Sequence, residues 1–298
     1  MYERLTGMLK MNDVQYEDDV KLSQLSSIRI GGRARIVIFP DSGDKLTSVL
    51  GYIKNEGIPF RIVGRMTNIL PPDEDFDIPV ITTRRYLGFS VTDDGHVLAN
   101  AGESLIRILR FCAEDDLGGC EALSGIPGTL GGLVTMNAGA FGAEISDFFL
   151  EARVLDIKTG KIFRILRDDM HFSYRSSVVK GSELLILSVK LKLKQKPNNE
   201  IYSDIAKYKQ LRLISQPTEP SLGSVFMRCG DVIPSRLIDE MGLRGRMIGG
   251  AVISEKHAGF IVNRGGATAK DFKALVEFIK GMVFTQAGVT ITEEVEYL

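Results

Sequence analysis

The sequence has no tryptophan and few of the residues that build metal centres or disulfide frameworks. Its 298 residues include three histidines and three cysteines, and the cysteines stand far apart at Cys112, Cys120 and Cys229. An odd number of widely spaced cysteines, with no CxxC pair, argues against both a disulfide framework and a zinc site. We therefore expect no bound metal, and a reducing, cytoplasmic compartment.

The chain also lacks an excess of charge of either sign. Lysine and arginine number 37, aspartate and glutamate 38, and the formal net charge is −1. A chain without a basic field does not attract nucleic acid or an anionic membrane by charge alone. No run approaches the roughly 20 apolar residues of a spanning helix, and the N-terminal residues contain no apolar core of signal-peptide length. We expect neither nucleic acid nor a membrane as a partner.

The composition that remains, 44% hydrophobic and 25% charged, is typical of a folded chain of about two domains. Strand and helix patterns alternate, which predicts an α+β fold, and residues 1–20 are expected to form a loose or short helical lead-in. Hydrophobic period and end signals predict strands over 34–40, 60–64, 189–194 and 289–298, and helices over 42–57, 104–118, 234–242 and 272–283. The polar stretch 194–200 contains Pro and Asn and is predicted to be a linker.

The most informative stretch is rich in glycine and runs from Ser124 to Gly142. Glycine lets main-chain amides approach a ligand without a Cβ atom in the way, so this density predicts a diphosphate cradle. Tight turns between short elements explain the same density equally well. The spacing matches neither the GxGxxG of a Rossmann turn nor a P-loop, so a nucleotide bound here needs another fold.

Several ordered motifs resemble those of the UDP-N-acetylenolpyruvoylglucosamine reductases (the MurB family), from about residue 26 to the end of the chain. An intact YRSS motif without an added loop after it resembles the shorter of the family's two subclasses. The motifs are SSIRIGGRA (26–34), SGIPGTLGGLVTMNAGAFGAEISD (124–147), FSYRSS (172–177), QPTEPSLGSVF (216–226), GGAVISEKHAGFIVN (249–263), ATAKD (267–271) and ITEEV (291–295).

The resemblance implies a flavoenzyme of peptidoglycan precursor synthesis. The implied fold has two subdomains that enclose non-covalent FAD, of the PCMH/vanillyl-alcohol-oxidase type, followed by a C-terminal α+β substrate domain. The implied bounds are a lead-in over 1–20, FAD-binding subdomains over 21–85 and 86–197, and a substrate-binding domain over 198–298. The implied reaction uses NADPH to reduce the enolpyruvyl group of a UDP-sugar to UDP-N-acetylmuramate, and such hydride chemistry requires a redox cofactor.

Three residues match the family's catalytic positions. Ser224 matches the proton donor, although a serine after glycine is more commonly a turn residue. Arg175 matches an arginine that can hold a carboxylate and stabilise developing negative charge, although an arginine in such a motif is usually a surface residue. Glu294 matches a catalytic glutamate, although in an alternating strand it would lie on a solvated face.

Further residues are implied to bind the cofactor or the substrate. The expected cofactor-binding residues are Gly64, Asn68, Gly125, Ile126, Pro127, Gly128, Gly131, Gly132, Asn137 and Gly139. The expected substrate-binding residues are Tyr174, Arg212, Lys256 and His257.

The chain departs from the family's motifs at two places. The family's GxGSN turn around the FAD diphosphate reads GRMTN over 64–68, so Met66 replaces a glycine. If that position needs a positive φ, a methionine there is sterically costly, and Arg65 can partly compensate by bringing charge to the phosphates. After Ser224 the sequence reads Met227-Arg228-Cys229 in place of a Lys-Asn-Pro type continuation.

These departures leave three hypotheses. The first is the reductase itself, acting as a cytoplasmic monomer on a UDP-sugar. The second is a flavin oxidoreductase of the same fold with another substrate. The third is a non-catalytic relative that has lost FAD, and the colour of the purified protein separates it from the two enzymes.

Overall fold

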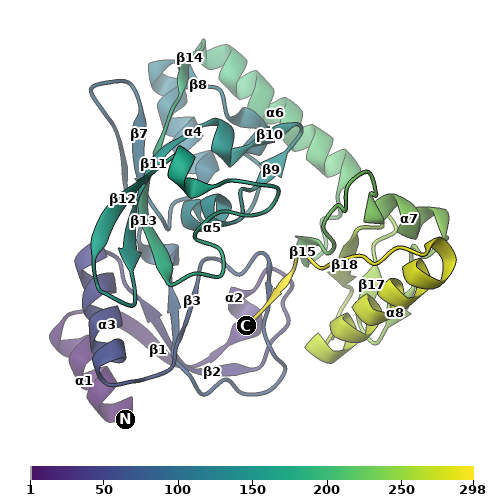
Figure 1. The fold of residues 1–298 in the computed structure, drawn as a ribbon, viewed down its shortest axis with the longest axis horizontal. Coiled ribbons are helices and arrows are strands. Elements are labelled where there is room, and N and C mark those ends of the chain that lie inside the picture. The colour runs from purple at the N-terminus through teal and green to yellow at the C-terminus, as the bar shows by residue number, and fades with distance from the viewer. Residues whose placement is uncertain (1) are drawn as a thin grey trace. The chain divides into compact units, whose positions relative to one another are not determined.

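The computed structural model describes residues 2–298 and is drawn in Figure 1. The chain forms two compact units, and each is assembled from separate segments. Unit 1 contains the residues up to 17 together with 37–64 and 80–212, and unit 2 contains 18–36, 65–79 and 213–298. These segments differ from the division expected at 20, 85 and 197. That division into domains stays a prediction.

Hydrophobic periodicity and end signals predict four of the eight α-helices in residues 2–298. The α-helices are α1 (Tyr2–Met11), α2 (Leu22–Leu25), α3 (Gly43–Asn55), α4 (Leu105–Cys112), α5 (Leu130–Thr135), α6 (Asn198–Ser215), α7 (Pro234–Glu240) and α8 (Ala269–Ala287). Ser42 caps α3 by accepting a hydrogen bond from the Lys45 amide, and Thr268 and Asp271 form a capping box on α8. The helices predicted over 42–57, 234–242 and 272–283 are confirmed as α3, α7 and α8. The helix predicted over 104–118 is α-helical only in α4, followed by a single 3-10 turn over Ala113–Asp115 and the strand β8 (Leu117–Gly118).

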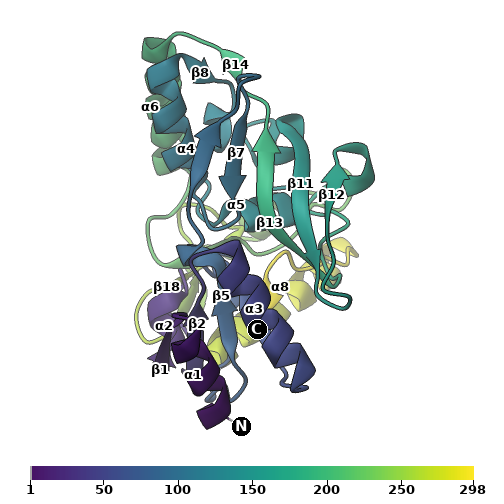
Figure 2. The same ribbon diagram turned by 90° about the vertical axis from the view of Figure 1, so that its left-hand side faces the viewer.

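A five-stranded antiparallel sheet forms a large part of unit 1. Its strand order is β12-β11-β13-β7-β6, and Figure 2 shows β7, β13, β11 and β12 side by side. Helix α5 packs against β13 and β7, where Val189 is fully buried. The bounds of these strands are β6 (Phe89–Val91), β7 (Val97–Asn100), β11 (Phe149–Asp156), β12 (Ile162–Leu166) and β13 (Leu184–Leu191).

The other sheets with strands in unit 1 are smaller. In the four-stranded sheet, ordered β1-β2-β5-β3, β5 pairs in parallel with both β2 and β3, and β1 and β2 continue past the bounds of the unit. Two-stranded sheets join β9 to β10 and β8 to β14. The bounds are β1 (Gln15–Lys21), β2 (Arg33–Phe39), β3 (Arg61–Val63), β5 (Val80–Thr82), β8 (Leu117–Gly118), β9 (Gly139–Ala140), β10 (Ala143–Glu144) and β14 (Lys194–Gln195).

Unit 2 is built on an antiparallel sheet with the order β15-β18-β17-β16. Its buried core includes Phe272 on α8 and is completed by Ile28, Ile30 and Leu70 from the first quarter of the chain. The C-terminal segment alone therefore does not supply the whole core. The strands are β4 (Ile69–Leu70), β15 (Ser221–Ser224), β16 (Met247–Ile248), β17 (Ala251–Ile253), β18 (Phe260–Asn263) and β19 (Glu296–Tyr297), and β19 pairs in parallel with β4.

Two predicted segments differ from the structure. The expected linker over 194–200 contains β14 and the beginning of α6, because the Pro197 carbonyl accepts hydrogen bonds from the amides of Glu200 and Ile201 and so starts the helix. The expected strand over 289–298 is strand only at β19, preceded by an isolated bridge at Glu293. Every second residue, from Thr292 to Leu298, forms a main-chain bond, but the partners belong to different segments, so the chain does not pair along one strand. Ile291 and Val295 remain on the buried side, as the alternation predicted.

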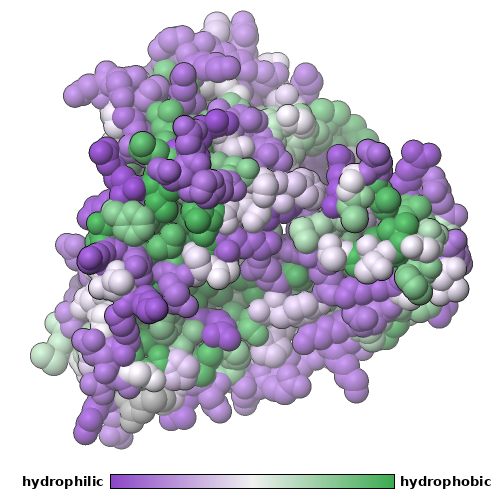
Figure 3. All heavy atoms as spheres, viewed as in Figure 1, coloured by the Kyte–Doolittle hydropathy of each residue, from purple (hydrophilic) through white to green (hydrophobic). Residues whose placement is uncertain are grey.

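The surface carries some exposed hydrophobic side chains. In Figure 3 hydrophobic residues gather over the strands β11, β12 and β13, and the edge strand β12 exposes Ile162, Phe163 and Leu166. Across residues 2–298, no helix combines the length and the apolar character that a membrane span requires.

Two glycines provide a matched test of the packing in unit 1. A Cβ atom on Gly102 would overlap the carbonyl oxygens of Thr83 and Tyr86, whereas a Cβ atom on Gly51, inside α3, meets nothing. We expect Gly102→Ala to destabilise the protein by more than about 2 kcal/mol and Gly51→Ala to stabilise it by about 0.5–1 kcal/mol. Urea unfolding of both variants measures this, and equal midpoints would contradict the packing.

Candidate active site

The glycine-rich segment of unit 1 forms an exposed loop over 125–128 that leads into α5. Thr129 caps this helix by accepting a hydrogen bond from the Gly132 amide, at 3.3 Å. The amides of Leu130 and Gly131 donate to the carbonyls of Glu103 and Ala101, at 2.7 and 2.9 Å, and fasten the start of the helix. The loop itself, with Ile126 and Pro127, stays at the surface.

Several of these glycines have close neighbours where a Cβ atom would lie. An added Cβ atom on Gly125 would lie 2.8 Å from Nε of Arg212, and one on Gly139 would lie 2.9 Å from the Ala143 carbonyl. Gly131 similarly approaches Ala101. Gly128 has φ +142°, a conformation that favours glycine. The tight-turn explanation of the glycine density is therefore correct for part of the segment.

The same loop also fits a flavin dinucleotide. Within residues 2–298, the main-chain amides of Gly125 and Gly128 donate to no protein acceptor, and both residues lie at the surface of the loop. Exposed amides in a glycine-rich turn are the groups that hold phosphate oxygens in proteins. The residues present thus match the donor set that a dinucleotide diphosphate requires.

The turn over 64–68 has a positive φ at Met66, the conformation that is costly for a methionine. Met66 has φ +47° and its side chain is 2% exposed. The position that holds a glycine in the family is therefore left-handed here, and the methionine pays the conformational cost while burying its side chain. Its carbonyl accepts a hydrogen bond from the Ser27 amide at 3.2 Å, and Gly64 lies in close contact with Thr129.

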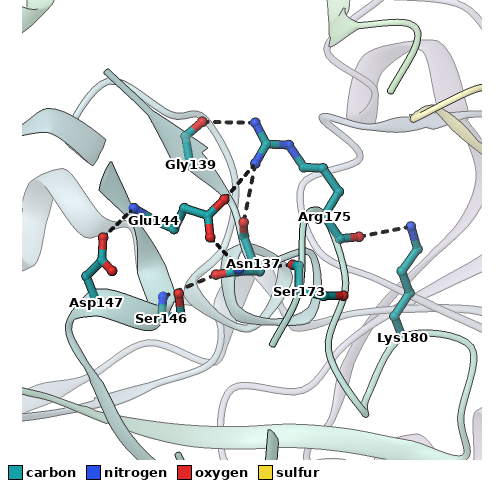
Figure 4. A network of polar contacts seen from close by, with 8 residues as sticks. All are labelled: Asn137, Gly139, Glu144, Ser146, Asp147, Ser173, Arg175 and Lys180. Atoms are coloured by element: carbon teal, nitrogen blue, oxygen red, sulfur yellow. Dashed lines mark hydrogen bonds and ion pairs between the residues drawn. The ribbon is translucent and has the colours of Figure 1, made fainter. Parts of the chain in front are cut away.

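Arg175 stands at the tip of a hairpin in unit 1 (Figure 4). Ser173 and Ser176 exchange two main-chain hydrogen bonds of 3.1 Å, and Arg175 between them has φ +55°. Its guanidinium donates to the carbonyls of Asn137 and Gly139, at 3.4 and 3.2 Å. The side chain is 17% exposed, so the charge is held in a defined place close to the surface.

Asn137 connects the glycine-rich segment to this hairpin. It is 1% exposed and has φ +41°. Its amide group donates to the Ser173 carbonyl at 3.0 Å and to the Glu144 carboxylate at 2.8 Å, and its Oδ1 accepts from the Ser146 amide at 3.2 Å. Asn137, Gly139 and Arg175, three of the predicted site residues, are therefore in direct contact.

Two predicted substrate-binding residues also lie in unit 1. Tyr174 has its ring centre 4.9 Å from the carbon of the Arg175 guanidinium. Arg212, in the last turn of α6, lies over the Phe141 ring at 5.9 Å, and burial lowers the pKa of its guanidinium. A partly desolvated arginine beside an aromatic ring is a good partner for an anion.

Ser224 and Glu294 are neighbours in unit 2. Ser224 ends β15 and pairs with Phe260 on β18. The Val225 amide donates to the Gly259 carbonyl at 2.9 Å, and the Val225 carbonyl accepts from the Glu294 amide at 2.7 Å. The segment that carries Glu294 therefore runs alongside the end of β15.

Asn68 holds the same segment from its other side. Its Nδ2 donates to the Glu294 carbonyl at 2.8 Å, and the Glu296 amide donates back to the Asn68 carbonyl at 2.9 Å. Asn68 was expected to bind the cofactor, and the structure gives it a main-chain role beside the predicted catalytic glutamate. The cofactor assignment stays a prediction.

Lys256 and His257 form part of a tight turn in unit 2. The Lys256 ammonium donates to the Leu213 carbonyl, and Nδ1 of His257 accepts from the Gly259 amide at 3.1 Å. Accepting at Nδ1 requires a deprotonated Nδ1, and burial lowers the pKa of this imidazole. Both residues have structural partners, and their role in substrate binding stays a prediction.

The residue that sequence reasoning missed is Glu144. It lies on β10 opposite Gly139, and its carboxylate contacts the side chains of both Asn137 and Arg175 (Figure 4). The sequence signal for this contact is the two-residue turn Phe141-Gly142. This turn folds β10, which carries Glu144, back on β9, which carries Gly139. The sequence did not show which acidic side chain would meet the arginine of a distant motif.

Comparison with known proteins gives agreement along the whole chain. The model of the UDP-N-acetylenolpyruvoylglucosamine reductase C-terminal domain matches residues 216–298, and that of an FAD binding domain matches residues 34–166. A UDP-N-acetylenolpyruvoylglucosamine reductase of Caldicellulosiruptor saccharolyticus is 37% identical over 295 residues, which is 98% of this chain and 94% of the relative. The chain belongs to the UDP-N-acetylenolpyruvoylglucosamine reductase family.

Solved structures agree with this assignment. The crystal structure of the family member from Thermus caldophilus superposes with a TM-score of 0.81, at 29% identity over 95% of this chain and 99% of that one. A glucooligosaccharide oxidase of Acremonium strictum, at 12% identity and a TM-score of 0.50, covers 97% of this chain and 60% of its own and shares the fold alone. The family and the FAD-binding α+β fold predicted from the motifs are confirmed.

The role of His257 can be tested through pH. Because its folded pKa lies below the ordinary value, the neutral ring contributes stability that is present above the unfolded pKa, about 6.5, and is lost as pH falls toward the folded pKa. We expect His257→Gln to flatten the fall of the thermal midpoint between pH 7.5 and pH 5. Parallel pH profiles of variant and wild type would refute the assignment.

Proposed function

We propose that this protein is an NADPH-dependent, FAD-containing reductase that converts UDP-N-acetylenolpyruvoylglucosamine to UDP-N-acetylmuramate. The observation that carries the proposal is near-complete coverage in both directions: 98% of this chain aligns with 94% of a relative bearing that name. The match to the FAD binding domain supports FAD as the cofactor.

The reaction requires a carrier of two electrons, which amino-acid side chains do not provide. FAD held by the glycine loop would supply this two-electron carrier, through which the hydride of NADPH would reach one carbon of the enolpyruvyl double bond. A proton added to the neighbouring carbon completes the saturation, and NADPH leaves as NADP⁺. The exposed glycine-loop amides described above are the groups we assign to the cofactor, with Gly125, Ile126, Pro127 and Gly128 in the loop.

We assign the proton to the hydroxyl of Ser224. A serine hydroxyl is a weak acid, so it needs a strongly basic carbon beside it and a group that restores its proton. The main-chain bond between Glu294 and Val225, the residue after Ser224, supports a role for Glu294 in that proton transfer.

We assign the substrate carboxylate to Arg175. A guanidinium matches a carboxylate in geometry and stabilises the negative charge that develops as the hydride arrives. Its fixed position, with two main-chain carbonyls on it and little exposure, supports this role because a preorganised donor needs no rearrangement during the reaction. Tyr174, Arg212, Lys256 and His257 are proposed to contact the rest of the substrate.

The same proposal covers the cellular compartment, the oligomeric state and the partners of the protein. We propose that the protein acts as a monomer in the cytoplasm, on a small UDP-sugar and without nucleic acid. The nearly balanced net charge supports the last point. All three cysteines are free thiols, and burial raises the pKa of the Cys112 thiol to about 11, which makes that thiol unreactive and suits a reducing compartment.

The visible spectrum of the purified protein tests the function and separates it from the alternatives. We expect a yellow protein that NADPH bleaches and that UDP-N-acetylenolpyruvoylglucosamine recolours. Recolouring only by other alkenes would favour a flavin oxidoreductase with another substrate. A colourless protein that added FAD does not reconstitute would favour a non-catalytic relative.

The role of Ser224 is tested by Ser224→Ala. We expect bleaching by NADPH to be nearly unchanged and recolouring by the substrate to slow by about 10²–10⁴-fold, because only the second half-reaction needs the proton. Stopped-flow absorbance measures both steps separately. A loss of the same size in the two half-reactions would remove Ser224 from the proposed role.

A further inference from the structure

Glu144 carries a carboxylate that joins two residues of the site in unit 1. One oxygen accepts a hydrogen bond from the Asn137 amide at 2.8 Å, and the other lies 3.9 Å from a terminal nitrogen of Arg175 (Figure 4). That same nitrogen donates to the Asn137 carbonyl. The carboxylate and the arginine are therefore connected twice, once directly and once through the buried Asn137.

The position of Glu144 is fixed by its own main chain. On β10 it pairs with Gly139, whose carbonyl also accepts from Arg175. The Glu144 amide donates to the Asp147 carboxylate at 2.8 Å in a capping box, which holds the residue where the chain turns. A side chain at 139 would strike both Glu144 and Arg175, so the glycine is needed for this approach.

This arrangement constrains the direction of the guanidinium. Two carbonyls and one carboxylate lie around the side of Arg175 that faces the glycine-rich segment, and each attracts an N–H group. A planar guanidinium that is held in this way cannot rotate without losing charge-assisted contacts. The Glu144 side chain is 38% exposed, so water weakens its electrostatic attraction to Arg175. Its main effect is therefore to orient the guanidinium.

We propose that Glu144 is a positioning residue: together with Asn137 it sets the direction in which Arg175 meets the substrate carboxylate. The proposal rests on the function proposed above, in which Arg175 binds that carboxylate. It assigns Glu144 no direct contact with the substrate and no step in proton transfer.

The test uses the FAD-loaded protein and follows the two half-reactions separately. In Glu144→Gln the side-chain oxygen can still accept from Asn137, but the negative charge beside Arg175 is gone. We expect recolouring by the enolpyruvyl substrate to slow by about two- to fivefold, the range of a partly exposed ion pair, with bleaching by NADPH unchanged. Glu144→Asp, which keeps the charge, should recover part of the rate.

Glu151→Gln is the matched control. Glu151 is an acidic residue of the same unit whose carboxylate lies 3.4 Å from Arg164 on the neighbouring strand, and within residues 2–298 this ion pair includes none of the site residues. We expect this variant to keep both rates, FAD content and thermal midpoint. The same three properties, measured for Glu144→Gln, show whether that variant remains folded and loaded.

A double-mutant cycle separates positioning from a structural role. We expect Glu144→Gln to add nothing to the loss caused by Arg175→Lys, because a lysine has no planar group to orient. Full additivity of the two losses, or lower FAD content with equal slowing of both half-reactions, would overturn the proposal. A wild-type protein that the substrate fails to recolour would overturn the proposed function instead, and is seen before any variant is made.

Discussion

The hydrogen bonding of the Asn137 side chain is the interaction on which the site in unit 1 depends. This buried amide group has three partners, and they come from the hairpin that carries Arg175, from β10 and from the turn that follows it. A buried amide left without partners costs about 1–3 kcal/mol, so the three segments have to assemble together. The position of the arginine charge is therefore a consequence of burying one asparagine.

Unit 2 is organised by an equivalent constraint on main-chain groups. Val225 is bonded on one side to Gly259 and on the other to the segment of Glu294, and Asn68 closes that segment from the first quarter of the chain. Buried main-chain groups have to be paired, and these pairings bring a serine and a glutamate from distant motifs into one neighbourhood. The core needs Ile28, Ile30 and Leu70 for a different reason: the C-terminal segment does not cover its own apolar surface.

The sequence predicted what local chemistry determines and failed where the chain is held by distant partners. Helices α3 and α7 follow from periodicity and from Ser42 and Pro234 at their starts, and α8 follows from its hydrophobic stripe over 272–283. The last ten residues are predicted to form one strand; they keep the alternation, with Ile291 and Val295 buried, but bond in turn to Val225, Asn68 and Leu70 in place of one partner strand. Motif resemblance supplied Arg175 and Asn137, but Glu144 became visible only once the β9–β10 hairpin had placed it beside them.

The departure at Met66 shows how an unfavourable local conformation is compatible with the fold of the family. A left-handed backbone costs a residue with a Cβ atom about 1–2 kcal/mol, whereas burying a methionine side chain contributes about 1.5–3 kcal/mol. Met66 is 2% exposed at φ +47°, so the two effects offset one another at this position. The packing of the methionine side chain therefore stabilises the left-handed turn. A residue with a Cβ atom can thus occupy a left-handed position when burial of its side chain offsets the cost.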